Sequence, residues 1–160
     1  MPLSSAEFTK ACQSALRKDH LADINAILDG HPEEARHPAI RWYVARETQL
    51  RSALARARAQ RAGVDPQRHV REYSGYDART DEIVAQAMSA ADPLERALLL
   101  DRHRWWLLDQ MAGPELFSPA AVFSYALKLL LAERLQSLAE AEGVAVAEHI
   151  VHGNLAGLSL

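Results

Sequence analysis

Apolar residues recur along this chain three and four positions apart, and proline or glycine interrupts the pattern every few helical turns. That period is typical of amphipathic α-helices, and no run alternates apolar and polar residues for long enough to predict a β-strand. Proline repeatedly follows a residue that can cap a helix, a position where its missing N–H group does no harm. Such pairs begin at His37, Asp65, Asp92 and Ser118. The pattern therefore predicts an all-α fold.

Capping and helix-breaking residues divide the chain into a bundle of about seven helices in one domain, residues 1–160. A capping box of Ser4 and Glu7 begins the first helix, Asp19 is expected to cap the second, and Gly143 is expected to end the most apolar one. Short loops between long helices make neighbours antiparallel. The predicted ranges, short segments included, are 4–18, 19–30, 37–63, 65–73, 77–90, 92–113, 118–143 and 144–152.

Two of these helices have distinctive apolar patterns. The helix over 118–143 is apolar around its whole axis, which is typical of a buried central helix. Its apolar side chains include Val122, Phe123, Leu127, Leu130, Leu131 and Leu135. The helix over 37–63 has only a narrow apolar stripe, which suits contact with one partner helix. That stripe consists of Tyr43, Leu50, Leu54 and Ala57. We therefore expect this second helix to project from the bundle as an arm.

Length and composition favour one cytoplasmic domain. With 160 residues, 49% of them apolar, the chain is long enough to bury one core and short for two. The single cysteine, Cys12, excludes an internal disulfide, and its spacing from Phe8 and Leu16 predicts a small buried side chain. The start of the chain lacks the charged and apolar segments of a secretion signal. The longest apolar run, 120–132, is too short to span a membrane.

Charge is distributed unevenly along the chain. The net charge is −3 at pH 7, from 18 lysine and arginine residues against 21 aspartate and glutamate residues. Between Arg41 and Arg71 there are eight arginines and only two acidic residues, so this segment carries +6 and the remainder −9. Such asymmetry favours recognition of a partner over chemistry. The candidate partner-binding residues are Arg46, Arg51, Arg56, Arg58 and Arg61.

Other interpretations of these arginines stay open. They can pair with acidic residues of neighbouring helices or solvate a projecting helix. Nucleic-acid binding is disfavoured because the whole chain is acidic and the arginines point around the helix instead of forming one face. A self-associating module, a homodimer through the stripe of Tyr43, Leu50 and Leu54, is a further alternative. We prefer a protein partner and expect no nucleic acid to be bound.

Catalytic patterns are missing from the sequence. It has no glycine-rich phosphate loop, nucleophile elbow or paired-carboxylate motif. The residues 101–104 precede two tryptophans, but their positions spread them around the helix axis. Asp101 and Arg104 are spaced for a modest surface ion pair worth roughly 0.3 kcal/mol. We therefore expect no enzyme activity, no catalytic residue and no cofactor.

The histidines do not predict a metal site. His149 and His152 lie three residues apart beside Glu148, but a transition-metal site needs three or four ligands that converge from different segments. His31 and His37 flank a Pro-Glu-Glu turn and are interpreted as solvent-facing loop and N-cap residues. We expect no bound metal.

The order of several motifs resembles one bacterial family. The segments are RWYVARETQLRSALARARAQRAGVD from Arg41, DPLE from Asp92, LLLDRHRWWLLDQM from Leu98 and FSPAAVFSYALKLLLAERLQSLAEAEG from Phe117. Together they resemble the DUF2764 proteins, which are encoded among the subunits of bacterial V-type (V/A-type) ATPases and resemble the central-stalk C or d subunit. The most specific features are L-R-x-x-L-A-x-x-R-A, beginning at Leu50, and F-S-x-x-x-V-F-x-Y-x-L-K-L-L. The resemblance covers about 5–150.

The resemblance implies a setting for the protein. A C-like subunit sits between the soluble shaft and the membrane rotor ring and transmits torque through contacts, so stiffness is the expected property. The implied function is that of a non-catalytic subunit or assembly factor in proton transport, whose partners are other ATPase subunits. Contact with the inner membrane would be peripheral, through the complex. Arg51, Arg58 and Arg61 are the expected contacts with an acidic partner surface.

Overall fold

The computed structural model describes the backbone of residues 4–156 and the side chains of residues 4–137. Within this part the chain is all-α and contains no strand, as the periodicity predicts. The helices are α1 (Ser5–Ala15), α2 (Lys18–Leu28), α3 (Pro38–Ala62), α4 (Ala78–Ser89), α5 (Pro93–Ala112) and α6 (Pro119–Ala156). Two short 3-10 helices, η1 (Pro32–Glu34) and η2 (Pro66–His69), lie in the connections.

Capping residues position most helix starts as predicted. The Ser4 side chain accepts from the Glu7 backbone N–H while the Glu7 carboxylate accepts from the Ser4 N–H, which completes the capping box. His37, Asp77 and Asp92 cap α3, α4 and α5 with their side chains. These bonds satisfy backbone donors that a helix start otherwise leaves unpaired.

Three predicted boundaries are wrong. Arg17 precedes α2 without a side-chain cap, and Asp19 lies inside the first turn, where its carboxylate contacts Arg17 at 3.1 Å. The segment predicted as a helix over 65–73 forms only the single turn of η2. Gly143 does not end a helix, because α6 continues to Ala156. A glycine costs a helix only about 1 kcal/mol relative to alanine, and no proline follows it to block propagation.

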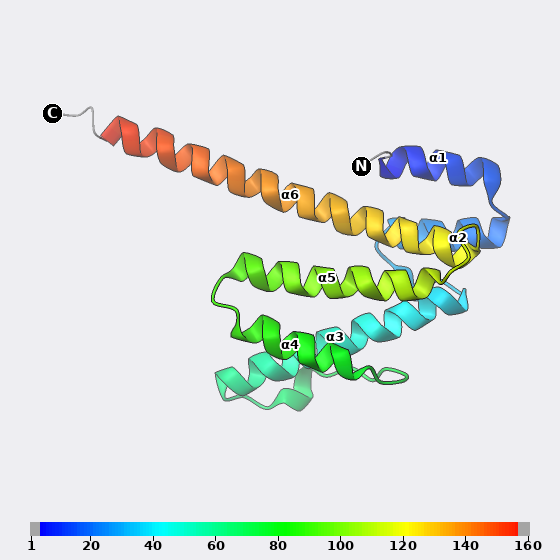
Figure 1. Ribbon diagram of the computed structural model, residues 1–160, viewed down its shortest axis with the longest axis horizontal. Helices are drawn as coiled ribbons and strands as arrows, with labels where there is room; N and C mark the ends of the chain where they lie inside the picture. Colours follow the sequence, from blue (N-terminus) through cyan, green and yellow to red (C-terminus); the bar gives the residue numbers. More distant parts are fainter. Residues whose placement is uncertain (1–3, 157–160) are drawn as a thin grey trace.

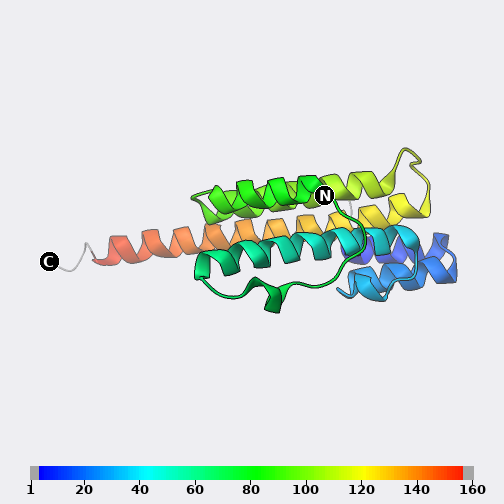
Figure 2. The same ribbon diagram turned by 90° about the horizontal axis from the view of Figure 1, so that it is seen from below.

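The helices form an elongated bundle (Figures 1 and 2), in which α5 is antiparallel to α4 and α6, whereas α3 runs parallel to α4. The helix α5 packs between α4 and α6 in opposite direction to α6, while α1 and α2 cover the first part of α6. The later part of α6 extends beyond the other helices (Figure 1). The arginine helix, α3, packs against α4, α5, η1, η2 and α6. The prediction that this helix projects from the bundle as an arm is therefore wrong.

Two apolar clusters form the core. The larger one joins α1, α2, the first part of α3, the end of α5 and the first half of α6. At its centre Phe123 has no exposed surface, which confirms the buried position predicted for the first half of α6. Cys12 also belongs to this cluster and is 4% exposed, as its spacing predicts. The smaller cluster joins the second part of α3, α4 and the start of α5 around Leu50 and Ala87.

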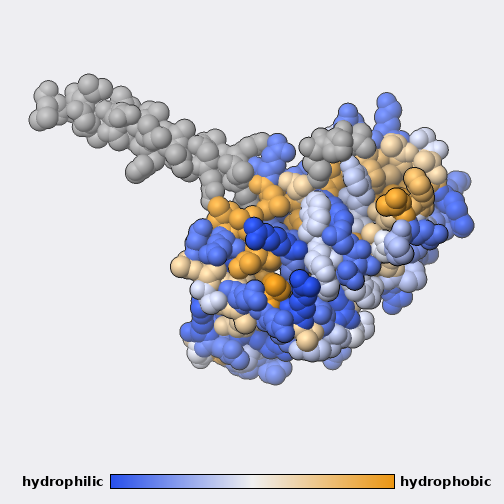
Figure 3. All heavy atoms as spheres, viewed as in Figure 1, coloured by the Kyte–Doolittle hydropathy of each residue, from blue (hydrophilic) through white to orange (hydrophobic). Residues whose placement is uncertain are grey.

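Hydrophilic residues cover much of the face in Figure 3 and are interspersed with smaller hydrophobic areas. The most exposed apolar side chains are Leu116 and Phe117, at 82% and 97%, in the connection between α5 and α6. In the described part of the chain, no helix combines the length and apolarity that a bilayer crossing requires.

Candidate functional site

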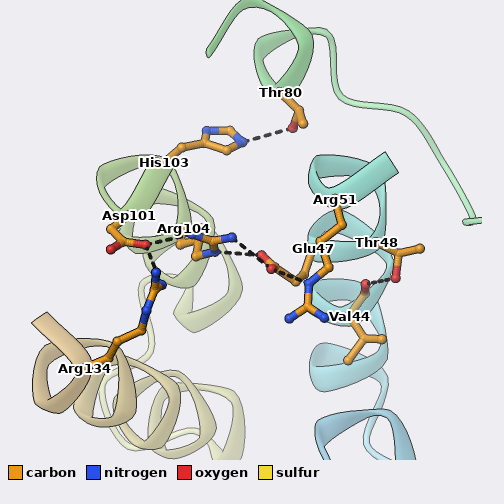
Figure 4. Close-up of polar contacts among 9 residues, drawn as sticks. All are labelled: Val44, Glu47, Thr48, Arg51, Thr80, Asp101, His103, Arg104 and Arg134. Carbon is orange, nitrogen blue, oxygen red and sulfur yellow. Dashed lines mark hydrogen bonds and ion pairs between the residues drawn. The ribbon is translucent and has the colours of Figure 1, made fainter. Parts of the chain in front are cut away.

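Charged side chains of three helices form a connected layer (Figure 4). Along α3 and α5, its residues fall between the members of the two apolar clusters. We call Glu47, Asp101 and Arg104 the polar layer. The Arg104 guanidinium donates to Glu47 at 3.0 and 3.1 Å and to Asp101 at 2.7 Å, and thereby joins α5 to α3. Each carboxylate has a second, more exposed partner: Arg51 contacts Glu47 at 2.9 Å, and Arg134 contacts Asp101 at 3.2 Å. The layer therefore links α3, α5 and α6.

The polar layer is largely removed from solvent, with Asp101 buried and Glu47 and Arg104 partly buried, contrary to the surface ion pair expected for Asp101 and Arg104. The Asp101 and Arg104 side chains are 2% and 15% exposed. Burial alone would lower the pKa of Arg104, but the charges and hydrogen bonds of Glu47 and Asp101 raise it overall. The expectation failed because α3 and α6 cover a helix face that sequence spacing alone assigns to solvent. A buried pair of this kind fixes the register of two helices.

His103 occupies a second buried position beside the polar layer. Its Nε2 lies 3.0 Å from the Thr80 hydroxyl, which donates to the Asp77 carboxylate at 2.8 Å. The ring stacks on Trp106 with centroids 5.7 Å apart. Burial lowers the pKa of His103, and the nearby Asp77 charge only partly offsets that effect. The contact between Thr80 and His103 joins α4 to α5. Because Thr80 has no exposed surface, its hydroxyl is not an accessible nucleophile.

Arg46 and Gln49 hold the connection before α4 against α3. Arg46 donates to the Ser74 carbonyl at 2.9 Å and to the Gln49 side-chain oxygen at 3.1 Å. The Gln49 amide donates to the Asp77 carbonyl at 2.8 Å, and its oxygen accepts from the Asp77 N–H at 3.0 Å. Gly75 lies directly on the guanidinium, so that a Cβ atom at this position would collide with Arg46. The connection between η2 and α4 therefore packs around the Arg46 side chain.

A small cleft opens beside Arg46. Its volume is about 260 Å³, and it lies between α3, α5 and the start of α4. The lining residues are Trp42, Arg46, Tyr76, Asp77, Trp106, Leu107 and Gln110. A second cleft, of about 520 Å³, shares Trp42 and is lined also by Arg41 and Tyr73. We call the smaller one the Trp42 cleft. Its mixture of tryptophan, tyrosine and arginine is the composition that dominates binding energy at protein surfaces.

The five candidate arginines are separated by the fold. Arg46 is only 8% exposed and bonded internally, so its charge does not lie on the outer surface of α3, and its role in partner binding stays a prediction. Arg61 donates to the Met88 carbonyl, and Arg56 lies 3.8 Å from Asp81, so both connect α3 to α4. Arg51 is exposed, with 74% of its side chain accessible, although it contacts Glu47.

Arg58 differs from the other four arginines. Its side chain is exposed on the second half of α3. It makes no hydrogen bond or ion pair with any other residue in the described part of the chain. Of the five candidates, Arg51, Arg58 and Arg61 are exposed. Because Arg61 is bonded to Met88 of α4, Arg51 and Arg58 are the two exposed candidates that make no bond to another helix in the described part of the chain.

The histidines in the described part of the chain form no metal cluster. Among residues 4–137, no group of three or more histidine, cysteine, aspartate or glutamate side chains is placed to hold an ion. His31 is exposed, as expected. His37 caps α3 through its Nδ1, which accepts from Ala39 at 3.2 Å, but it is half-buried against Phe123 and not solvent-facing. The pair His149 and His152, with Glu148, lies outside the described side chains.

One residue of the Trp42 cleft, Arg46, could have been predicted as buried from the periodicity of α3. Arg46 precedes Leu50 by four residues and Ala53 by seven, so it falls on the apolar face of α3. A single arginine on such a face predicts a buried cation. Its neighbours Trp106 and Tyr76 come from distant segments, and no spacing rule predicts their meeting.

Comparison with known proteins adds no relative. No family model matches this chain, and no curated protein or solved structure shows a significant match to it.

Proposed function

We propose that this chain is a non-catalytic helical subunit or assembly factor that acts by binding other proteins. The partners we propose are subunits of a bacterial V-type ATPase, on the basis of the motif order that resembles the ATPase-associated DUF2764 family. The observation that carries protein binding is the pair of solvent-facing cations on α3, Arg51 and Arg58. We call their surface the Arg51–Arg58 face.

The spacing of these residues favours a single contact. Arg58 follows Arg51 by seven positions, which places both on one side of α3, two turns and about 10 Å apart. Leu50 and Leu54 are buried behind them and fix the helix against α4 and α5. A partner therefore meets two charges on a rigid helix and loses little entropy in ordering it.

Charge complementarity indicates the partner surface. Two arginines with exposed guanidinium groups favour carboxylates, which arginine binds in a bidentate geometry. Rim charges of this kind steer association and confer specificity more than they add affinity, and salt screens them. We therefore expect the partner to present an acidic patch and the complex to form more slowly at high ionic strength.

The polar layer supports a mechanical function. Arg104 ties α5 to α3, and Arg134 of α6 shares the Asp101 carboxylate. Side chains joined in this way resist sliding of the helices past one another because every shift breaks charged hydrogen bonds. A subunit that transmits force between partners needs such stiffness.

Affinity purification of the tagged chain from its native host tests the proposal. The test variant is Arg51→Glu/Arg58→Glu, and its matched control is Lys10→Glu/Arg102→Glu. The control makes the same change in charge at exposed residues of α1 and α5. We expect the wild type and the control to retain V-type ATPase subunits at moderate salt and the test variant to lose them. Circular dichroism should give equal helix content for all three.

Two outcomes would contradict the proposal. If the test variant retains the same proteins as the wild type, the Arg51–Arg58 face is not the contact. If the wild type recovers only nucleic acid, or only a second copy of itself, the function is that of a nucleic-acid-binding or self-associating module. Nucleic-acid binding would then fall steeply with salt concentration.

A further inference from the structure

The Trp42 cleft contains a cation that the described part of the chain leaves without an anionic partner. Arg46 is 8% exposed, and its two hydrogen bonds go to neutral acceptors, the Gln49 side-chain oxygen and the Ser74 carbonyl. Its Nε is buried and has no hydrogen-bond partner among the described residues. A buried charge is costly unless an opposite charge or a full set of hydrogen bonds compensates it. The site therefore favours an added anion.

The charged residues that line the cleft are Arg46 and Asp77. The Arg46 guanidinium lies 5.8 Å from the Trp42 ring centre, and Arg79 lies 4.4 Å from that of Trp106. Asp77 is the one carboxylate that lines the cleft in the described part of the chain. Its oxygens already accept from the Arg79 N–H at 3.3 Å and the Thr80 hydroxyl at 2.8 Å. Asp77 is thus occupied by two donors, whereas Arg46, the one cation among the described residues that line the cleft, has only neutral acceptors.

We propose that the Trp42 cleft binds a carboxylate carried on an aromatic or short apolar group. Arg46 supplies the charge, and Trp42, Tyr76 and Trp106 supply flat apolar walls. A volume of about 260 Å³ is below the range of roughly 300–1,000 Å³ typical of larger ligands, so the cleft encloses one acidic group with one ring and leaves the rest of a larger molecule outside. This site lies apart from the Arg51–Arg58 face, and the inference does not rest on the proposed function.

The cleft is organised before any ligand binds. Gly75 has a φ angle of +70°, and its backbone packs on the guanidinium. Gln49 is bonded twice to the Asp77 backbone, which keeps the connection in place over α3. A fixed guanidinium loses little freedom when an acid binds. The arrangement is therefore suited to weak but selective capture of a small acidic group.

Binding of phenylacetate by the full chain is the direct test. The variant Trp105→Phe serves as background, because Trp105 does not line the cleft and its removal leaves Trp42 and Trp106 as the fluorescent residues. Phenylacetamide and phenethylamine have the same ring with a neutral or a positive group. We expect saturable quenching by phenylacetate with a Kd at least tenfold lower than for either analogue. Equal binding of acid and amide, or tighter binding of the amine, would overturn the proposal.

Two substitutions locate the binding site. Arg46→Met removes the charge, and Gln110→Glu adds a negative charge to the cleft without altering Arg46 or its bonds. We expect each to weaken phenylacetate binding at least tenfold, and Gln13→Glu, an exposed control on α1, to leave it unchanged. If Arg46→Met fails to fold, Gln110→Glu still decides the question. Unchanged affinity in Gln110→Glu would place the acid elsewhere and overturn the assignment.

A blocked dipeptide distinguishes the two sources of such a carboxylate. N-acetyl-aspartyl-phenylalanine amide presents an acidic side chain beside an aromatic ring, as a segment of a partner protein would. If this dipeptide binds at least tenfold more tightly than phenylacetate, the ligand of the cleft is an acidic peptide segment. If phenylacetate binds at least tenfold more tightly, the ligand is a free acid. Failure of both to bind overturns the proposal and leaves the Arg51–Arg58 face untouched.

Discussion

Replacement of Arg104 by methionine tests the polar layer, because this residue is the cation that joins α5 to α3. Methionine keeps most of the side-chain volume and removes only the charge and the hydrogen bonds. Three bonds are lost, two to Glu47 and one to Asp101. Arg51 and Arg134 remain as partners of the two carboxylates, but their side chains are 74% and 53% exposed.

The expected loss of stability follows from this geometry. Removal of one partner of a buried ion pair typically costs about 3–5 kcal/mol, because an uncompensated charge stays in the interior. Glu47 and Asp101 each keep one exposed arginine, so we expect the lower end, about 3 kcal/mol. Arg51→Met, which removes only an exposed i,i+4 partner of Glu47, should cost about 0.5 kcal/mol. The roughly sixfold difference between the stability losses of Arg104→Met and Arg51→Met is the quantity that tests the polar layer.

Equilibrium unfolding in urea, followed by circular dichroism, measures both values. The triple variant Glu47→Gln/Asp101→Asn/Arg104→Met serves as the control for charge, since it removes the carboxylates with the cation. It should recover part of the loss, because no unpaired charge remains buried. If Arg104→Met costs less than 1 kcal/mol and the triple variant costs more, the polar layer is not a buried ion-pair network, and the reasoning is refuted.

Three further substitutions test other parts of the fold. Phe123→Ala should cost about 3–5 kcal/mol because it leaves a cavity at a fully buried position, whereas Phe117→Ala, at a residue 97% exposed, should cost close to nothing in the same urea titration. His103 should make stability fall as the pH drops below 6.5: burial lowers its pKa in the folded state, so the unfolded chain binds more protons. Thermal unfolding from pH 7.5 to pH 5 should show this slope, and His103→Gln should flatten it. Gly75→Ala should cost about 1–3 kcal/mol, because the φ angle of +70° strains alanine and the new Cβ collides with Arg46. A wild-type melting temperature in Gly75→Ala would contradict the packing of the connection before α4.

The features that depend on local sequence were predictable. The period of apolar residues gave the all-α fold, and the capping residues gave the starts of most helices within one or two residues. Cys12 and Phe123 were correctly placed in the core because Cys12 lies four positions from Phe8 and Leu16, and Phe123 lies four positions before Leu127. Such predictions succeed since each depends on only one helix.

The features that depend on several helices were not predictable. The spacing of Asp101 and Arg104 is that of a surface pair, and only the arrival of Glu47 from α3 makes it part of a buried layer. The narrow apolar stripe of α3 suggested an arm, but Arg46 and Gln49 also face the protein, so the buried face is wider than apolar residues indicate. Polar side chains with internal partners are invisible to a count of apolar positions.

The continuous α6 illustrates a different error. Gly143 was interpreted as a helix end because glycine often follows the last turn. Glycine ends a helix when it adopts a positive φ angle, as Gly63 does after α3 with a φ angle of +66°. Sequence alone does not separate the two cases, since both glycines follow an alanine- and charge-rich helical segment.

Photo-crosslinking at position 58 tests the central claim, protein binding through the Arg51–Arg58 face, most directly. A benzoylphenylalanine in place of Arg58, in the full chain expressed in its native host, would report which molecule contacts that face. The same group in place of Arg102 on α5 is the control. We expect a crosslinked protein at position 58 that is absent from position 102 and that mass spectrometry identifies as a V-type ATPase subunit. The same products from both positions, or none from position 58, would contradict it.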